Sequence, residues 1–184
     1  NYPDENDDLY KNFWPATLHL IGKDILRFHA VYWPAFLLAA NIKPPKRIYG
    51  HGWILSDQKK MSKSLGNVVT PQAVMEQNGA DILRLWVVSS DYYSDLRIGP
   101  EIIKRMTDTY RRFRNTLRYL LGALDGFNQA EQVGYNEMPD LEKWVLHRIA
   151  TLDDRICRMT ETYDFHGIFT ELHPVSYTHL RAHE

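Results

Sequence analysis

The segment Thr17-Leu18-His19-Leu20-Ile21-Gly22-Lys23-Asp24 predicts the first strand of the fold and the turn that follows it. Its short apolar run begins and ends in β-branched residues before a glycine, which is typical of a buried strand. Asp24 is suited to cap a helix that extends through about Ala40, and Pro34 should kink or split that helix. A second strand is expected over 47–55. Strand, helix and strand in this order indicate a parallel α/β unit, where ligands bind at the carboxyl ends of the strands.

A loop with two lysines follows the second strand. In Lys60-Met61-Ser62-Lys63-Ser64, followed by Leu65-Gly66-Asn67, two ammonium groups lie three residues apart between small hydroxyl residues. Lysine is a compact cation on a flexible stem, so two of them on a mobile loop can neutralise a triphosphate during nucleotidyl transfer. A solvated basic turn is the alternative interpretation of these residues.

Beyond this loop the sequence is helical. Short helices are expected over 71–77 and 81–89, a long helix between Pro100 and Gly126, and another over 141–162. Apolar residues recur at spacings of three and four along the long helix, which is typical of a helical bundle. They are Ile103, Met106, Tyr110, Phe113, Leu117, Leu120 and Leu124. Residues 1–13 are polar and are expected to form a loop.

Composition narrows the class of protein. The chain has 184 residues, of which 44% are hydrophobic, enough for one sizeable domain or two small ones. Cys157 is the only cysteine, so an intrachain disulfide is impossible, and no residues have zinc-ligand spacing. The sequence contains no long apolar run and no signal-peptide pattern, although it does not begin with methionine. We therefore expect a cytoplasmic protein without a membrane partner.

Charge is segregated along the chain, although the net charge is only −1. Residues 97–118 carry seven basic side chains against two acidic ones. Four of the basic residues share one face of the long helix, outside its apolar stripe. They are Lys104, Arg111, Arg114 and Arg118. Such a row suits the phosphates of a nucleic acid, and a solvated charged face is the alternative interpretation.

Resemblances of two segments to known enzymes indicate a function for these patterns. The five residues from Lys60 to Ser64 match the signature loop of class I aminoacyl-tRNA synthetases, and residues 13–35 closely resemble methionyl-tRNA synthetase. The resemblance implies that Gly22 and Asp24 approach the ATP ribose and the substrate amino group. It also implies that His51 lies near the adenylate and that His29 and Trp33 border the amino-acid pocket. Lys60, Ser62 and Lys63 would bind ATP, and the two lysines would stabilise the departing pyrophosphate.

Beyond the lysine loop the sequence resembles isoleucyl-tRNA synthetase instead. Gly79–Trp86, Asp95–Pro100 and Leu141–Arg148 carry this resemblance. The two families share much of 60–69, so a join there would be invisible to inspection. We therefore expect a chimeric fragment, methionyl-like over about 10–69 and isoleucyl-like over about 60–173. A single divergent synthetase is the alternative.

The resemblances imply an α/β fold followed by an all-α part. Residues 1–69 would be the C-terminal part of a Rossmann-like class I catalytic domain, and 70–99 connecting stem helices. A truncated helical bundle of the anticodon-binding type would occupy 100–173. Residues 174–184, with His173, His179 and His183 in or beside them, match neither family and are expected to be a non-native tail.

The implied activity is that of an aminoacyl-tRNA ligase. ATP activates methionine or isoleucine, and the acyl group then passes to tRNA, with Mg²⁺ accompanying the ATP and no metal bound by the protein. The other class I signature, H-I-G-H, is absent, because Lys23 stands where its last histidine would follow His19-Leu20-Ile21-Gly22. The fragment is therefore expected to be inactive alone. The catalytic portion is expected to be of the methionine type; an isoleucyl-tRNA synthetase fragment and a helical tRNA-binding module without catalysis are the alternatives.

Overall fold

The computed structural model describes residues 8–56 and 58–174. These residues form two compact units, one of 8–68 with 91–98 and the other of 69–90 with 99–174. The segment 70–99, expected to connect two domains, is therefore divided, because 91–98 belong to the first unit and supply a strand there. Most of the expected tail, 175–184, lies outside the described residues.

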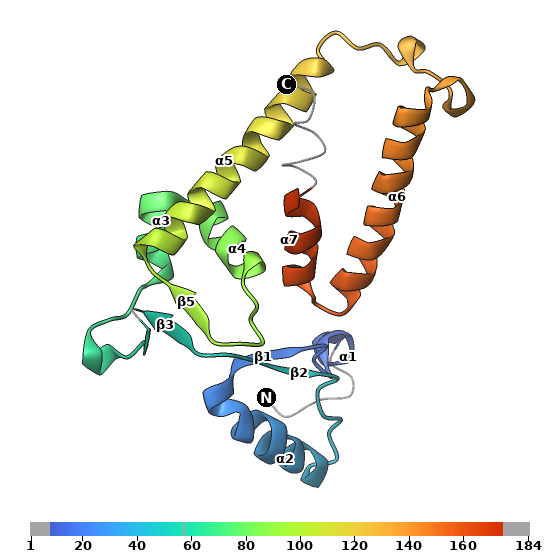
Figure 1. The fold of residues 1–184 in the computed structure, drawn as a ribbon. Coiled ribbons are helices and arrows are strands. Elements are labelled where there is room, and N and C mark those ends of the chain that lie inside the picture. The colour runs from blue at the N-terminus through green and yellow to red at the C-terminus, as the bar shows by residue number, and fades with distance from the viewer. Residues whose placement is uncertain (1–7, 57, 175–184) are drawn as a thin grey trace. The chain divides into compact units, whose positions relative to one another are not determined.

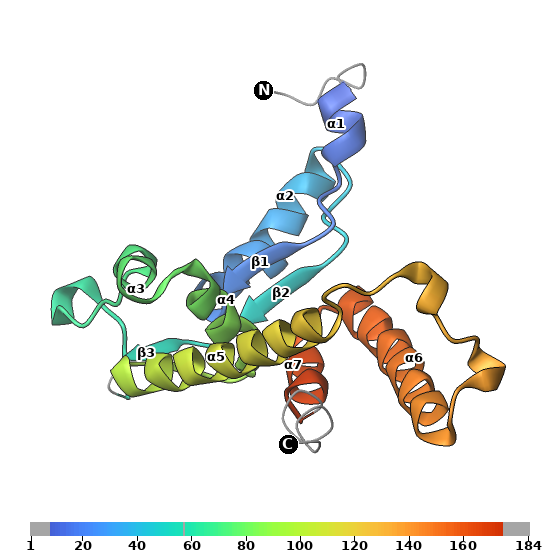
Figure 2. The same ribbon diagram turned by 90° about the horizontal axis from the view of Figure 1, so that it is seen from above.

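The first unit contains the expected parallel pair of strands. β1 (His19–Gly22) runs parallel to β2 (Ile48–His51), and Gly22 lies opposite His51 in the register. Helix α2 (Trp33–Ala39) connects them along the chain and runs beside them in Figure 2. Ile21 and Leu37 are buried and form the small core of this part.

The helix expected over 24–40 forms without interruption, but its hydrogen-bonding pattern changes along its length. A 3-10 turn (Lys23–Ile25) and a π-helical turn (Phe28–Tyr32) precede α2. The split predicted at Pro34 does not occur, and the kink stays a prediction; because Pro34 lacks an N–H and its ring crowds the preceding turn, it accounts for the π-helical turn there. The N–H of Trp33 donates to the carbonyl of Phe28, five residues back, which is the hydrogen bond of a π-helix.

The cap predicted at Asp24 is wrong. Gly22 takes the cap position of the 3-10 turn, without a side-chain hydrogen bond, and Asp24 lies inside the turn. The carboxylate therefore does not satisfy the N-terminal amides, and it stays exposed at the end of β1. The loop expected over 1–13 is also wrong in part, because α1 (Asp8–Phe13) is helical, with Asp8 and Lys11 placed favourably for the helix dipole.

The second strand, expected over 47–55, is interrupted at Gly52-Trp53. β3 (Ile54–Ser56) follows the interruption and belongs to a second sheet. There it pairs antiparallel with β4 (Lys59–Lys60) and parallel with β5 (Leu96–Ile98). The lysine loop therefore begins as the return strand of a tight hairpin.

The second unit is helical, as expected. Its helices are α3 (Pro71–Asn78), α4 (Ala80–Ser89), α5 (Pro100–Ala123), α6 (Asp140–Glu161) and α7 (Phe165–Pro174). Figure 1 shows α4 beside α5, with α3 next to α4, and α6 beside α7. Ile82, Trp86 and Ile103 are buried where α4 meets α5. No helix of the described residues is long and apolar enough to span a membrane.

The apolar stripe of α5 is only partly covered. Ile103 is buried and Phe113 contacts Phe169 of α7, with ring centroids 6.4 Å apart. Leu117 and Leu124 are 60% and 58% exposed, so the last turns of the helix lack the packing that the stripe predicts. The assignment of these helices to an anticodon-binding domain stays a prediction.

Candidate functional site

The carboxyl ends of β1 and β2 bring three of the predicted nucleotide-binding residues together. A Cβ atom built on Gly22 would lie 2.5 Å from Asp24 Oδ1 and 3.6 Å from His51 Cε1. Asp24 therefore keeps its place only because residue 22 has no side chain. This edge of a parallel sheet is where ligands bind in open α/β folds.

The imidazole of His51 is held by its own chain. Its Nδ1 lies 2.8 Å from the carbonyl oxygen of Gly52, and the residue is half-buried. The ring is thus oriented at the end of β2 independently of any ligand.

The lysine loop is closed by Asn67. Its Oδ1 accepts the N–H of Ser62 at 2.9 Å, and its Nδ2 donates to the carbonyl of Lys60 at 3.3 Å. The Ser62 and Ser64 hydroxyls are hydrogen-bonded at 2.7 Å. Lys63 begins a 3-10 turn (Lys63–Leu65), and its side chain is exposed. One asparagine thus spans both arms of the loop.

Lys60 and Lys23 meet the same aromatic ring. The Nζ atom of Lys60 lies 3.2 Å from the centroid of Trp53, and that of Lys23 lies 5.3 Å from it. Lys23 also forms an ion pair with Asp95, whose Oδ1 accepts the N–H of Trp53 at 2.9 Å. Hydrogen bonds from Lys23 and from that N–H lower the pKa of Asp95. The lysine loop is therefore anchored beside the residue that follows β1.

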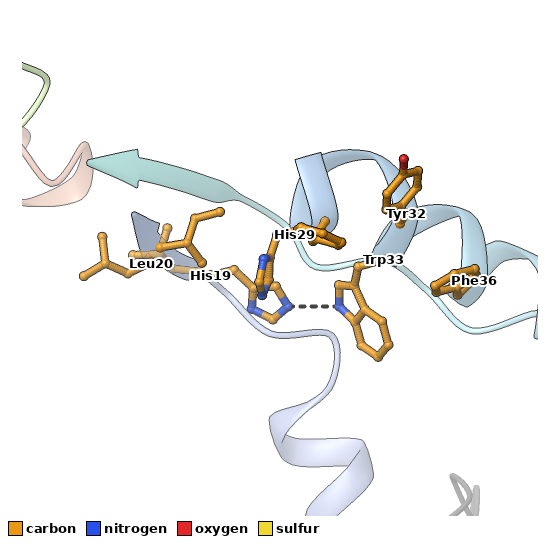
Figure 3. Close-up of a pocket in the computed structure, with 9 residues that line it drawn as sticks. His19, Leu20, His29, Tyr32, Trp33 and Phe36 are labelled. Carbon is orange, nitrogen blue, oxygen red and sulfur yellow. Dashed lines mark hydrogen bonds between the residues drawn. The ribbon is translucent and has the colours of Figure 1, made fainter. Parts of the chain in front are cut away.

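The predicted amino-acid pocket is an open, largely apolar cavity of about 770 Å³ between β1 and the helix after it. His29 and Trp33 both line it. Trp33 Nε1 donates to His19 Nε2 at 3.2 Å, and His29 Nδ1 lies 3.0 Å from the carbonyl oxygen of Ile25. Figure 3 shows Trp33 directed at His19, with His29 beside that pair. Aromatic walls with a few oriented polar atoms are usual in small-molecule sites.

The basic row of α5 is solvent-exposed, as a nucleic-acid contact requires. Lys104, Arg114 and Arg118 are exposed, and Arg111 is exposed with a 3.7 Å ion pair to Asp108 one turn earlier. The row belongs to the second unit, separate from the residues of the sheet edge.

Sequence reasoning missed five residues of this site: His19, Lys23, Trp53, Asn67 and Asp95. The alternation of side chains in a hairpin could have indicated that Trp53 and Lys60 share a face, since the turn between their strands is short. Asp95 carried no such signal, because it lies 72 residues from its partner Lys23. Among the described residues, no group of three or more histidine, cysteine or acidic side chains is placed to hold a metal ion.

Comparison with known proteins gives consistent similarities. Residues 1–107 match the family described as tRNA synthetases class I (M). The isoleucine–tRNA ligase of Gluconobacter oxydans is 45% identical over 174 residues, which cover 92% of this chain and 18% of that protein. The isoleucine–tRNA ligase of Bartonella henselae is 39% identical over 184 residues, covering 97% and 18%.

A solved structure is also similar. Methionyl-tRNA synthetase of Mycobacterium tuberculosis, in complex with methionyl-adenylate, superposes with a TM-score of 0.81 at 34% identity. The alignment covers 96% of this chain and 35% of that one. The predicted resemblance to both methionyl and isoleucyl enzymes is thus confirmed. The chain spans about a fifth of the length of the curated relatives that it matches.

Proposed function

The chain belongs to the class I tRNA synthetase family, and on this premise we propose that it is the part of an aminoacyl-tRNA ligase that holds ATP and an amino acid during activation. The observation that carries the proposal is the arrangement around Gly22. Asp24 and His51 flank it at the carboxyl ends of two parallel strands, and Lys60 lies over a ring that Lys23 also contacts.

Each residue has a role that its chemistry suits. The carboxylate of Asp24 can accept hydrogen bonds from ribose hydroxyls or from the ammonium group of an amino acid. Lys60 and Lys63, with the hydroxyl of Ser62, would meet the phosphates of Mg²⁺-bound ATP and stabilise the departing pyrophosphate. Since phosphoryl chemistry depends on positioning and charge neutralisation, these contacts would supply much of the rate.

The amino acid is a hydrophobic one, methionine or isoleucine. The cavity lined by His29 and Trp33 has aromatic walls, which suit a polarisable thioether, and this favours methionine. The sequence similarity to isoleucine–tRNA ligases favours isoleucine. Amino-acid-dependent pyrophosphate exchange by a full-length enzyme carrying this sequence distinguishes the two.

Lys63→Ala tests the role of the loop. In a full-length enzyme carrying this sequence, we expect the rate of adenylate formation to fall about 100-fold, because a transition-state contact of roughly 3 kcal/mol is lost. Stopped-flow measurement of adenylate formation checks this. Lys59→Ala removes a neighbouring charge outside the motif and should leave the rate within a factor of two or so. An unchanged rate in Lys63→Ala would show that the role assignment is wrong.

Transfer of the acyl group to tRNA in the cytoplasm is the second half of the proposal. The exposed basic row of α5 supports a tRNA contact, because phosphate binding needs accessible cations. The same row supports a second candidate, a tRNA-binding module without catalysis. Pyrophosphate exchange by the full-length enzyme separates the two, since a binding module shows none.

A join between two genes within 60–69 stays a prediction. The family match continues to residue 107 and the similarity to isoleucine–tRNA ligases covers most of the chain, so both similarities cross that segment. Amplification across codons 55–75 from the source DNA tests it. One product spanning the segment would establish a single gene.

A further inference from the structure

Two ammonium groups approach the side chain of Trp53 within cation–π distance. Lys60 Nζ lies 3.2 Å from its ring centroid and Lys23 Nζ lies 5.3 Å away. A cation over an indole is attracted by the ring quadrupole, and tryptophan is the strongest partner of this kind. The shorter distance makes Lys60 the closer partner.

The hairpin register produces this contact. Lys60 pairs with Leu55 and Lys59 pairs with Ser56, and the pairing continues to the hydrogen bond from Met61 to Ile54. Trp53 immediately precedes β3, and continuing the alternation of side chains back from Leu55 puts it on the same face as Leu55. Lys60 is therefore the diagonal neighbour of Trp53 across the hairpin, within reach of a long side chain. Lys59 lies on the other face.

The two ammonium groups differ in how they are neutralised. Lys23 is paired with the carboxylate of Asp95, so its position is fixed by a partner of opposite charge. Among the described residues no salt bridge joins Lys60 to a carboxylate, and its exposed ammonium group lies over the indole face. An anion can therefore take Lys60 from the ring without separating an ion pair.

We propose that Trp53 is a resting site for Lys60. The indole holds the ammonium group while the loop carries no phosphate, and the di- or triphosphate of a nucleotide removes the ammonium group from the ring when it binds. This inference rests on the proposed function, because it takes Lys60 to be a phosphate ligand. Trp53 is a positioning residue in this scheme, since it acts through Lys60 and need not touch the nucleotide.

The proposal predicts that removing the Trp53 indole strengthens phosphate binding. Removal of the indole abolishes a competitor for the ammonium group, so Trp53→Leu should bind phosphate more tightly than the unmodified chain. A cation–π contact at an exposed site corresponds to a gain of about two- to fivefold in affinity. Trp53→Phe keeps a weaker aromatic face and should fall between the two. A purely structural role for Trp53 predicts the opposite, because a damaged loop binds more weakly.

The experiment uses the 184-residue chain with inorganic pyrophosphate as the probe. Isothermal titration calorimetry measures how much Trp53→Leu raises the affinity for pyrophosphate, once with Lys60 present and once in a Lys60→Ala background. We expect the affinity gain to vanish in that background, because the two residues act through one contact. Lys59→Ala is the matched control, since it removes the same charge from the opposite face of the hairpin and should preserve the gain.

Nuclear magnetic resonance tests the resting state directly. Protons over an aromatic face are shifted upfield, so the Lys60 ε-methylene signal should be shifted in the free chain and normal in Trp53→Leu. Pyrophosphate should return the signal to its normal position. A normal signal in the free chain overturns the inference, and so does weaker or unchanged pyrophosphate binding by Trp53→Leu. The proposed function fails separately if Lys60→Ala and Lys63→Ala both bind pyrophosphate as the unmodified chain does.

Discussion

Gly52 shows how a single position determines the path of the chain between two sheets. A Cβ atom at this residue would lie 2.0 Å from the carbonyl oxygen and 2.5 Å from the carbonyl carbon of Ser94. Both are backbone atoms, so no side-chain rotation relieves the clash. The N–H of Gly52 also donates to the carbonyl of Tyr92 at 3.1 Å, which holds the two segments together.

Gly52→Ala should therefore be strongly destabilising. We expect the free energy of unfolding to fall by about 3 kcal/mol, the upper range for overpacking, since backbone must move. Urea denaturation followed by tryptophan fluorescence measures the change. Gly122→Ala is the matched control, because open space surrounds that position in α5 and alanine favours a helix. Equal effects of the two substitutions would contradict the close approach at Gly52.

For individual helices and strands, the sequence predicted which elements form better than where each one begins and ends. The helices α3 to α6 were predictable chiefly from their apolar positions and from the prolines that open α3 and α5; of these four helices only α3 also has a side-chain cap, the Thr70 hydroxyl that accepts the N–H of Ala73. The interruption after β2 was not predictable. It depends on Ser94, which is distant in sequence, and a run of apolar and β-branched residues alone favours one continuous strand.

The residues of the candidate site also divide into those whose position the sequence predicts and those whose position it does not. Gly22, Asp24 and His51 converge because parallel strands end at one edge, which sequence order alone can predict. The ion pair of Lys23 with Asp95 depends on the return of 91–98 to the first unit, and local pattern contains no information on that return.

The basic face of α5 gives a prediction that belongs to this element. Arg114→Glu with Arg118→Glu, in a full-length enzyme carrying this sequence, should reduce the slope of log affinity for tRNA against log salt by about 2. Each residue contributes about one phosphate contact in the proposal. Filter binding at several salt concentrations measures the slope. Arg105 lies about 100° from Lys104 around the helix, so Arg105→Glu should change the slope less. An unchanged slope would show that the row does not touch tRNA.

Over the whole molecule, burial is uneven among the helices of the second unit. Ile82 and Trp86 of α4 are buried, whereas α6 has no buried residue and leaves Leu141 and Ile149 more than half exposed. Most of the stability of a helix in a protein comes from the packing of its apolar face, so packing decides how well α6 persists. Among the described residues, the apolar side chains of α6 are covered only in part.

Hydrogen exchange should reveal this difference. We expect backbone amides in the middle of α6 to exchange at least about tenfold faster than those of α4, which corresponds to an opening free energy lower by about 1.4 kcal/mol. Exchange followed by mass spectrometry at peptide resolution measures both helices in one sample. Equal protection would indicate that α6 is covered by contacts beyond those described.

The fixed ring of His51 has a consequence for what the first unit recognises. A carbonyl oxygen has no hydrogen to give, so the nitrogen that faces Gly52 must carry one, and the neutral ring keeps a lone pair on its other nitrogen. Such a nitrogen accepts a hydrogen bond, so its partner must be a donor. On the proposed function, we expect this nitrogen to accept from a sugar hydroxyl or from the ammonium group of an amino acid, while the lysines bind the phosphate oxygens.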